Sequence, residues 1–337
     1  MVLYNTGSSP KSVGVGDFNG DNKIDLAVCN NGDDTVSVFL NDGHGNLISQ
    51  ISLLTEPLPE SIAIGDINDD NKTDLIVCSY HNNLISIFLG YGNGSFAKQP
   101  NFPFASSFSI ALSNFNNNKL KDVVVGMYDN NTIGILFDYS NGSFGEQATF
   151  PTSFAPLSVV IADFNSDNHA DIAVTNNNNG TVSILLGYGN GSFATQLLFQ
   201  TGSGPTLLAA GDLNGDNRTD LAIVNNDNET VSVLLGSGNG SFANQMTFST
   251  GSHPLPIALG DFNNDHILDI AVGNYDNSAV SILPGYGNGS FAGQSIFLTG
   301  SKPQAMAVGD VNDDQQLDLI VANYADNNVG ILFNTCQ

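Results

Sequence analysis

The chain has 337 residues with 33 acidic and 8 basic side chains, and its net charge of −25 excludes nucleic acids and anionic membranes as expected partners, because both would be repelled. Hydrophobic residues make up 41% of the chain, which is enough for a core. Asn, Asp, Gly and Ser separate the short apolar runs, a pattern typical of many short strands joined by turns.

The ends and the cysteines of the chain predict no membrane span and no disulfide framework. No run of about 18 apolar residues is present. The first ten residues, MVLYNTGSSP, have neither a basic nor an apolar leader region, so we expect no signal peptide in this chain. The chain has three cysteines, a small and odd number, so we expect no set of structural disulfides.

An acid-rich nonapeptide recurs along the chain. Its first residues are 49, 48, 49, 49, 49 and 49 residues apart. A fixed period of this length indicates a repeat architecture. We therefore expect a single domain over residues 1–337, with nonapeptides at 17–25, 66–74, 114–122, 163–171, 212–220, 261–269 and 310–318.

Each unit contains four short apolar runs separated by turn residues. In the fifth unit these runs are 206–213, 221–226, 230–236 and 242–248. No unit shows helical periodicity over three turns, and Gly, Asn and Pro recur at the spacing of all-β folds. We expect every unit to form a four-stranded antiparallel blade.

The two ends of the chain predict how the seven blades are arranged. The last unit stops after its third strand, whereas residues 4–7 and Pro10 match residues 248–251 and Pro254 of the fifth unit with a constant offset of 244. An open solenoid has no use for such a permuted strand, while a ring uses it to pair an exposed edge. The fold class is therefore all-β, a seven-bladed β-propeller in which residues near 2–5 complete the last blade beside residues 329–333.

The nonapeptides are expected to bind calcium. Calcium takes six to eight oxygen ligands, and these loops place oxygen side chains at positions 1, 3, 5 and 9, with a backbone carbonyl at position 7. Zinc would favour Cys or His, which these four positions lack. The expected ligands are Asp17, Asn19, Asp21, Lys23, Asp25; Asp66, Asn68, Asp70, Lys72, Asp74; Asp163, Asn165, Asp167, His169, Asp171; Asp212, Asn214, Asp216, Arg218, Asp220; Asp261, Asn263, Asp265, Ile267, Asp269; and Asp310, Asn312, Asp314, Gln316, Asp318.

The third nonapeptide differs from the other six. It reads Asn114, Asn116, Asn118 and Asp122 at the ligand positions, which leaves one carboxylate instead of three. We expect no calcium there and about six calcium ions in all. Six ions would bring the net charge from −25 to −13, which explains much of the acidity.

The segments VGVGDFNGDNKIDLAVCN, LAAGDLNGDNRTDLAIVNN and IALGDFNNDHILDIAVGNY resemble FG-GAP repeats, also grouped as VCBS repeats, which form the head of integrin α-subunits. The resemblance covers the whole chain and implies a seven-bladed propeller with calcium in its hairpin loops. Family loops usually carry Gly at position 6, where a left-handed backbone is needed. Here Asn22, Asn71, Asn168 and Asn217 replace it, and His266 and Gln315 fit less well.

The sequence indicates a binding module and not an enzyme. No nucleophile with a base, open metal site or phosphate loop is recognisable, and the five histidines lie at unrelated positions of their repeats. The GYGNGS segments are hairpin turns, because no helix follows them. Asn-rich loops and blade links share the face opposite the calcium loops. Four of these loops have a tyrosine at the same position of the repeat: Tyr80, Tyr128, Tyr275 and Tyr324.

Those tyrosines are candidate ligand contacts, although packing over the blade ends is an equally good interpretation. The expected ligand is a protein, in an integrin-like adhesion module, or a glycan, in a lectin-like module; an enzyme with a site at the channel mouth is a third alternative. Calcium loops of this kind are weak and favour a secreted protein or a cell-surface ectodomain. We expect a monomeric propeller. Asn-x-Ser sequons at Asn93, Asn141, Asn190, Asn239 and Asn288 agree with secretion.

Overall fold

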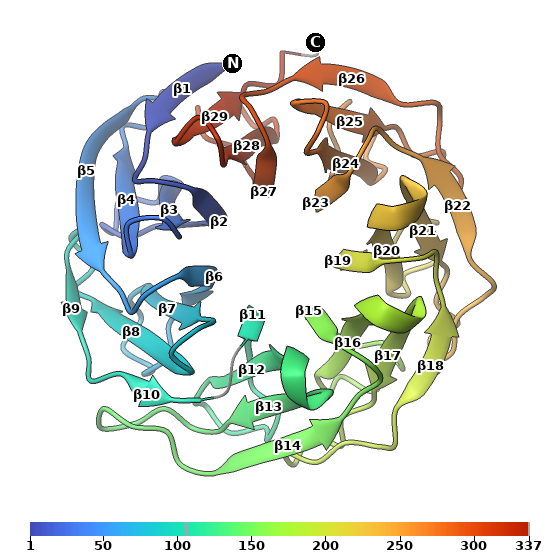
Figure 1. Ribbon diagram of the computed structural model, residues 1–337, viewed down its shortest axis with the longest axis horizontal. Helices are drawn as coiled ribbons and strands as arrows, with labels where there is room; N and C mark the ends of the chain where they lie inside the picture. The colour runs from blue at the N-terminus through green and yellow to red at the C-terminus, as the bar shows by residue number, and fades with distance from the viewer. Residues whose placement is uncertain (105–106, 336–337) are drawn as a thin grey trace.

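A ring of seven antiparallel sheets surrounds a central channel in the computed structural model, which describes residues 1–104 and 107–335 (Figure 1). Every sheet is one blade, and its four strand positions run from the channel to the rim. The seven-bladed propeller predicted from the repeat is confirmed. No helix of the described residues is both long enough and apolar enough to cross a membrane.

The innermost strands line the channel and the second strands form the core of each blade. The inner strands are β2 (Pro10–Gly16), β6 (Pro59–Gly65), β11 (Ser107–Ser113), β15 (Pro156–Ala162), β19 (Pro205–Gly211), β23 (Pro254–Gly260) and β27 (Pro303–Gly309). The second strands are β3 (Asp25–Asn30), β7 (Asp74–Ser79), β12 (Asp122–Met127), β16 (Asp171–Asn176), β20 (Asp220–Asn225), β24 (Asp269–Asn274) and β28 (Asp318–Asn323).

The third and fourth strands complete the blades toward the rim. The third strands are β4 (Thr35–Asn41), β8 (Leu84–Gly90), β13 (Thr132–Leu136), β17 (Thr181–Leu185), β21 (Thr230–Leu234), β25 (Ala279–Leu283) and β29 (Asn328–Leu332). The outer strands are β5 (Leu47–Leu54), the split pair β9 (Phe96–Lys98) and β10 (Phe102–Pro103), β14 (Gln147–Pro151), β18 (Leu197–Gln200), β22 (Met246–Ser249), β26 (Ser295–Leu298) and β1 (Val2–Asn5).

Burial explains why the second strands read as continuous apolar runs. Every residue of β3 is buried, because neighbouring blades cover both of its faces. Leu26 and Val28 pack with Ile320 of blade 7, whereas Ala27 packs with Ile62 of blade 2. Successive side chains of a strand point to opposite faces, so those of β3 pack into two different cores, one against each neighbouring blade.

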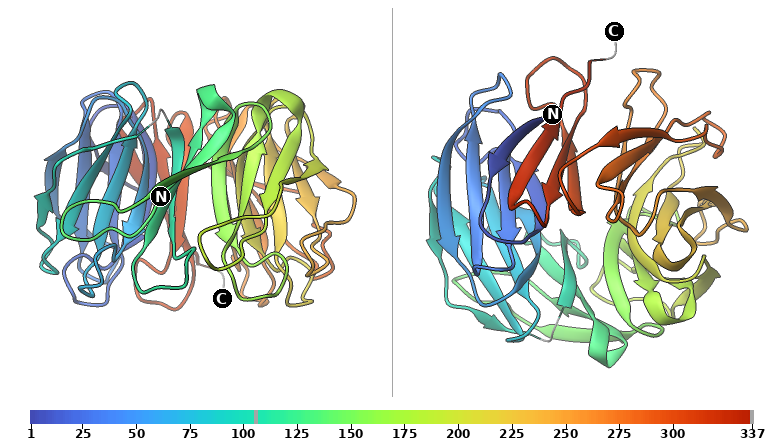
Figure 2. Two further views of the ribbon diagram at one scale, coloured as in Figure 1. Left: turned by 90° about the horizontal axis from the view of Figure 1, so that it is seen from below. Right: turned by 45° about the horizontal axis from the view of Figure 1, so that its top comes forward.

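The ring closes through the N-terminal strand, as predicted. β1 pairs antiparallel with β29, with Val2 opposite Ile331 and Asn5 opposite Asn328. The strand order of this blade from rim to channel is β1, β29, β28 and β27. Figure 1 and Figure 2 both show β1 beside β29, so segments from the two ends of the sequence form one blade.

Candidate functional site

The nonapeptide loops connect the inner strand of each blade to its second strand and lie on one face of the disc that Figure 2 shows from the side. Asp17 follows β2, and Asp25 is the first residue of β3. The hairpin turn of the next blade contacts the loop, since the backbone N–H of Gly94 donates to the carbonyl oxygen of Phe18 at 2.8 Å. Loops and GYGNGS turns therefore share this face, as the strand order predicts.

The carboxylate at position 1 organises the backbone of the loop. In the fifth loop, Oδ1 of Asp212 accepts backbone N–H groups from Gly215 at 2.7 Å and Asp216 at 3.2 Å. Its Oδ2 accepts the N–H of Asn217 at 2.7 Å. The side chains at positions 3 and 5 face each other, because Nδ2 of Asn214 donates to Oδ2 of Asp216 at 3.3 Å. The side-chain oxygens of positions 1, 3 and 5 are thus gathered around one tight turn.

Left-handed backbone conformations at positions 4 and 6 make the turn possible. The position-6 residues Asn22, Asn71, Asn168 and Asn217 have φ between 59° and 63°. His266 and Gln315, which lack the conformational freedom of glycine, adopt the same region at 64° and 68°. The loops of units six and seven therefore have the same local fold as the other intact loops.

The carboxylate at position 9 is buried and ties the loop to the blade. In the fifth unit Oδ2 of Asp220 accepts the N–H of Leu213 at 2.8 Å, and Oδ1 accepts the N–H of Gly236 at 2.7 Å. Asp220 is 0% exposed. The same two bonds occur at Asp25, Asp74, Asp122, Asp171, Asp269 and Asp318.

Burial raises the pKa of this position-9 carboxyl group. Desolvation is the main cause and raises the pKa of Asp220 to about 6, although the hydrogen bonds from Gly236 and Leu213 lower it. The neighbouring carboxylates Asp216 and Asp212 raise it further. Three negative charges in one loop therefore destabilise one another, which is the electrostatic condition that a bound cation relieves.

The third loop departs from the other six in its backbone as well as in its composition. Asn117 has a left-handed backbone at position 4, but Lys119 at position 6 does not. Nδ2 of Asn114 donates to the carbonyl oxygen of Asn118, and Nδ2 of Asn118 donates to Oδ1 of Asp138 at 2.6 Å. Side-chain amides therefore bond to the loop and its neighbour where the other loops present carboxylates.

Three position-7 side chains are cationic and lie close to loop carboxylates. Nζ of Lys72 lies 4.0 Å from Asp70, and Arg218 lies 3.8 Å from Asp216, while Lys23 pairs with Asp313. Across the described ranges, no three His, Cys, Asp or Glu side chains converge as a ready metal cluster. Each loop's donor set instead combines carboxylates, an Asn oxygen and a backbone carbonyl, which is the oxygen chemistry that calcium accepts.

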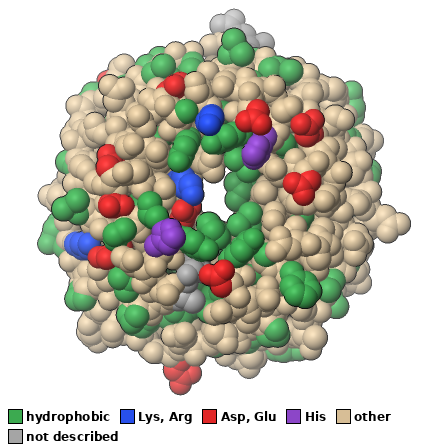
Figure 3. All heavy atoms as spheres, in the orientation of Figure 1, with side chains coloured by type: hydrophobic (Ala, Val, Ile, Leu, Met, Phe, Trp, Pro, Cys, Tyr) green, Lys and Arg blue, Asp and Glu red, His purple; other side chains and the backbone are tan. Residues whose placement is uncertain are grey.

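The opposite face carries the Asn-rich loops and the blade links. The N–H of Asn226 donates to the carbonyl oxygen of Gly204 at 2.9 Å, and the N–H of Tyr275 donates to that of His253 at 3.0 Å. The short 3-10 turns η1 (Tyr128–Asn130), η2 (Asn177–Asn179) and η3 (Asn226–Asn228) lie on this face. These turns face the viewer in Figure 1, so Figure 3 shows this face, with hydrophobic side chains around the channel mouth.

The four predicted tyrosines are half-buried and do not form one cluster. Tyr80 stacks on Phe108 with ring centroids 4.3 Å apart, and Phe108 contacts Tyr128 edge-on at 5.4 Å. Tyr275 lies in another blade, with Nζ of Lys302 5.2 Å from its ring centroid. The backbone N–H of Tyr324 donates to the carbonyl oxygen of Lys302 at 3.0 Å.

Sequence reasoning missed two features at the channel mouth. Phe108 links two of the tyrosines, although its unit lacks the Pro that marks the inner strand elsewhere. Nζ of Lys11 pairs with Glu60 at 2.6 Å, and Nδ2 of Asn31 donates to the same carboxylate at 3.1 Å. The exact 49-residue offset of Lys11 and Glu60 was the signal, because equivalent positions of adjacent blades are spatial neighbours.

A family model described as the FG-GAP-like repeat matches residues 17–77, 114–174, 163–223, 212–272 and 261–321, which together span more than half of the chain. No curated protein sequence matches.

Solved structures with the same ring have low sequence identity to this chain. The BBS1N chain of a complex with ARL6DN aligns with a TM-score of 0.70 at 13% identity, covering 99% of this chain and 97% of that one. A streptogramin B lyase gives 0.68 at 11% identity, with coverage of 99% and 97%. An Agrocybe aegerita lectin that recognises non-reducing terminal N-acetylglucosamine gives 0.60 at 16% identity, with coverage of 96% and 87%. These similarities show the fold alone, because it hosts unrelated functions.

Proposed function

The chain belongs to the FG-GAP-like repeat family, and on that premise we propose that it is a calcium-stabilised binding module of the adhesion type. The metal ions brace the blades on one face, and the opposite face or the channel mouth contacts the ligand. One observation carries the metal assignment. Six loops combine three carboxylates with left-handed backbone at positions 4 and 6, and the loop with one carboxylate lacks the second left-handed residue.

The residues present fit calcium in the six intact loops. Asp212, Asn214, Asp216, Asp220 and the backbone carbonyl of Arg218 would hold the ion in the fifth loop. Calcium bound there would neutralise carboxylates that otherwise repel one another and would cross-link the loop. The chain's own hydrogen bonds already shape the turn, so little ordering of the backbone remains for the ion to impose.

Calorimetric titration of chelator-treated protein with calcium tests this part of the proposal. We expect about six sites per chain and a higher melting temperature in calcium. The variant Asp216→Ala should lose one site, whereas Asn118→Ala, at the same position of the third loop, should lose none. No heat of binding and no change in melting temperature would refute the metal assignment.

The proposed ligand is a protein that contacts the loop face near the channel mouth. The polar side chains of Lys11, Glu60 and Asn31 contact one another there. The inner strand next to that of Glu60 carries Phe108, whose ring stacks on Tyr80. Binding sites typically place a few polar groups among apolar and aromatic side chains. Loops on a rigid scaffold commonly carry such contacts.

A glycan is the second candidate ligand, because the aromatic group of Tyr80, Phe108 and Tyr128 offers a ring surface next to Asn-rich loops. A glycan array separates the two candidates. Saturable glycan binding that Tyr128→Ala weakens and Tyr188→Ala preserves would favour the lectin-like function. Tyr188 is the matched control because it is 59% exposed on a hairpin turn of the other face.

We further propose that the chain is not an enzyme and acts as a monomer outside the cell. The two His–Asp pairs of the described residues, His253 with Asp276 and His266 with Asp261, lie on exposed loops of opposite faces. The weak affinity expected of such loops suits extracellular calcium concentrations. The sequon residues Asn93, Asn141, Asn190, Asn239 and Asn288 are all exposed, as glycosylation requires.

A further inference from the structure

Five hairpin turns on the face of the nonapeptide loops share the sequence Asn-Gly-Ser-Phe. They are residues 93–96, 141–144, 190–193, 239–242 and 288–291 of blades 2 to 6. In four of these turns the glycine N–H donates across the junction to the position-2 carbonyl oxygen of the preceding blade's nonapeptide. The pairs are Gly94 with Phe18 at 2.8 Å, Gly191 with Phe115 at 2.8 Å, Gly240 with Phe164 at 2.9 Å and Gly289 with Leu213 at 3.1 Å.

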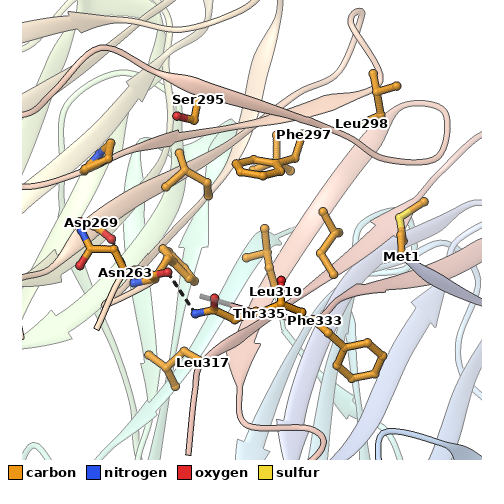
Figure 4. A pocket seen from close by; sticks show the side chains of 16 residues that line it. Met1, Asn263, Asp269, Ser295, Phe297, Leu298, Leu317, Leu319, Phe333 and Thr335 are labelled. Atoms are coloured by element: carbon orange, nitrogen blue, oxygen red, sulfur yellow. Dashed lines mark hydrogen bonds between the residues drawn. The ribbon is translucent and has the colours of Figure 1, made fainter. Parts of the chain in front are cut away.

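The turn of blade 3 does not make this hydrogen bond. Its glycine is Gly142 and the equivalent acceptor is the carbonyl oxygen of Ile67, but no hydrogen bond joins them within the residues that the structure describes. At the two remaining junctions a side-chain amide is the donor instead. Nδ2 of Asn41 donates to the carbonyl oxygen of Val311 at 2.7 Å, and Nδ2 of Asn334 donates to that of Phe262 at 3.0 Å (Figure 4).

A buried tyrosine explains why the turn of blade 3 differs. Tyr188 is 59% exposed on the turn of blade 4, whereas Tyr139, at the same position of blade 3, is 1% exposed. The ring of Tyr139 packs edge-on against Phe144, with centroids 5.1 Å apart. Asp138 precedes it in a left-handed conformation, at φ 57°, where the other four turns have glycine. The inward position of Tyr139 therefore changes the path of the chain into the turn.

The result is a tight turn with Asn141 and Gly142 at its tip. Ser140 and Ser143 pair across it, and the two central residues have φ of 50° and 82°, as Asn-Gly hairpin turns require. Asn141 is exposed, and a Cβ placed on Gly142 would have no atom within 4 Å. The tip of this turn therefore projects into open space.

The asparagine side chain is also held in the other four turns. In blade 4, Oδ1 of Asn190 accepts the N–H of Ser192 at 3.0 Å and its hydroxyl group at 2.6 Å. Asn93, Asn239 and Asn288 make the same two bonds. In blade 3 the N–H of Ser143 donates to the carbonyl oxygen of Ser140 at 3.1 Å instead. The side chain of Asn141 makes no hydrogen bond within the described part of the chain.

The remaining Asn-Gly pairs of the chain resemble the held turns. Each of their asparagines has a hydrogen-bonded side chain: Asn19, Asn31, Asn179 and Asn214. Among the Asn-Gly pairs, which all lie in the described ranges, Asn141 with Gly142 is thus the one pair without a hydrogen bond at either the asparagine side chain or the glycine N–H.

We propose that Asn141 is a site of spontaneous deamidation in the folded protein, because its turn leaves both reacting groups free. The backbone nitrogen of Gly142 attacks Cγ of Asn141. The bond between this nitrogen and Cγ forms, the Cγ–Nδ2 bond breaks, and ammonia leaves with the proton that the Gly142 N–H gives up. Water then opens the cyclic imide at either carbonyl and leaves aspartate or isoaspartate. One water is consumed and one ammonia is released, so no oxidant or cofactor is needed.

The modification changes the chemistry of this turn permanently. The product carries an added negative charge on the face of the nonapeptide loops. It also lacks the amide of the sequon Asn141-Gly142-Ser143, so an aged turn can no longer accept an N-linked glycan.

Timed incubation of the folded, unglycosylated protein at mildly alkaline pH, followed by peptide mapping with mass spectrometry, tests the proposal. The other four Asn-Gly-Ser-Phe turns are internal controls, because their local sequence is the same. We expect Asn141 to deamidate about tenfold faster or more than Asn93, Asn190, Asn239 and Asn288, since those sites must first break hydrogen bonds. In denaturant the five rates should converge.

A pair of reciprocal variants tests the role of the turn. The double variant Asp138→Gly/Ser140→Gly gives blade 3 the turn sequence of residues 187–193 and should slow deamidation of Asn141 toward the rate of Asn190. The reverse change, Gly187→Asp/Gly189→Ser, should speed deamidation of Asn190. Thermal melts of both variants show whether the propeller is intact.

Equal rates at the five sites of the folded protein, or a faster rate at one of the four held turns, would overturn the proposal. An unchanged rate at Asn141 in an intact Asp138→Gly/Ser140→Gly variant would also overturn it, because the turn would then not control the reaction. The comparison within the unmodified chain stands on its own if a variant does not fold.

Discussion

Oδ1 of Asp220 accepts the backbone N–H of Gly236 at 2.7 Å, across the fifth blade and 16 residues along the chain. The same carboxylate accepts the N–H of Leu213, so it joins the nonapeptide loop to the end of the third strand. This contact recurs in the third unit at Asp122, where the other two loop carboxylates are absent. Position 9 therefore has a structural role that does not depend on metal.

Asp220→Ala and Asp216→Ala should consequently differ in their dependence on calcium. Asp220→Ala leaves two buried N–H groups without their charged acceptor and should lower stability by about 3 kcal/mol or more with or without calcium. Asp216→Ala removes an exposed loop carboxylate and should lower the melting temperature only in calcium. Thermal melts of both variants in calcium and in chelator measure the calcium dependence of the two losses. The same calcium dependence in both variants would contradict the different roles of positions 5 and 9.

Acidification should stabilise the chelator-treated protein. Burial raises the pKa of Asp122 from its ordinary value of 3.8 to about 6. The folded chain therefore binds more protons than the unfolded chain between these pH values, and stability rises as the pH falls from 7 toward 4. The melting temperature measured against pH should show this slope, and Asp122→Asn should reduce it. A melting temperature that falls from pH 7 to pH 5 in chelator would be inconsistent with this account.

Ring closure by β1 should make the N-terminus essential for stability. Residues 2–5 pair with β29, and the hydroxyl group of Tyr4 donates to the carbonyl oxygen of Gly45 in the adjacent blade at 3.0 Å. Deleting Met1 to Thr6 exposes the edge of β29 and should lower the melting temperature by far more than trimming a free terminus. Adding the peptide MVLYNT should restore part of the loss. An unchanged melting temperature would mean that β1 contributes little.

The regular spacing of the nonapeptides was sufficient to predict the architecture, because each repeat forms one blade and the blades follow one another in chain order. The offset between Tyr4 and Phe248 predicted the closing strand, and the structure confirms it. The third loop was recognised from its composition. Its altered backbone was not, because the sequence does not show that Lys119 lacks the left-handed conformation that His266 and Gln315 adopt.

Contacts between blades were harder to predict than contacts within them. The double hydrogen bond of Asp220 depends on the distance between two strand ends, which no single motif reports. The stacking of Tyr80 on Phe108 joins units 2 and 3 and requires the ring geometry.

Anomalous diffraction from crystals grown in calcium, recorded at a wavelength where calcium scatters anomalously, tests the central claim most directly. The account predicts one peak within each of the six intact loops, near Asp17, Asp66, Asp163, Asp212, Asp261 and Asp310, and none near Asn114. Loops without peaks at millimolar calcium, or a peak of equal height beside Asn114, would contradict it.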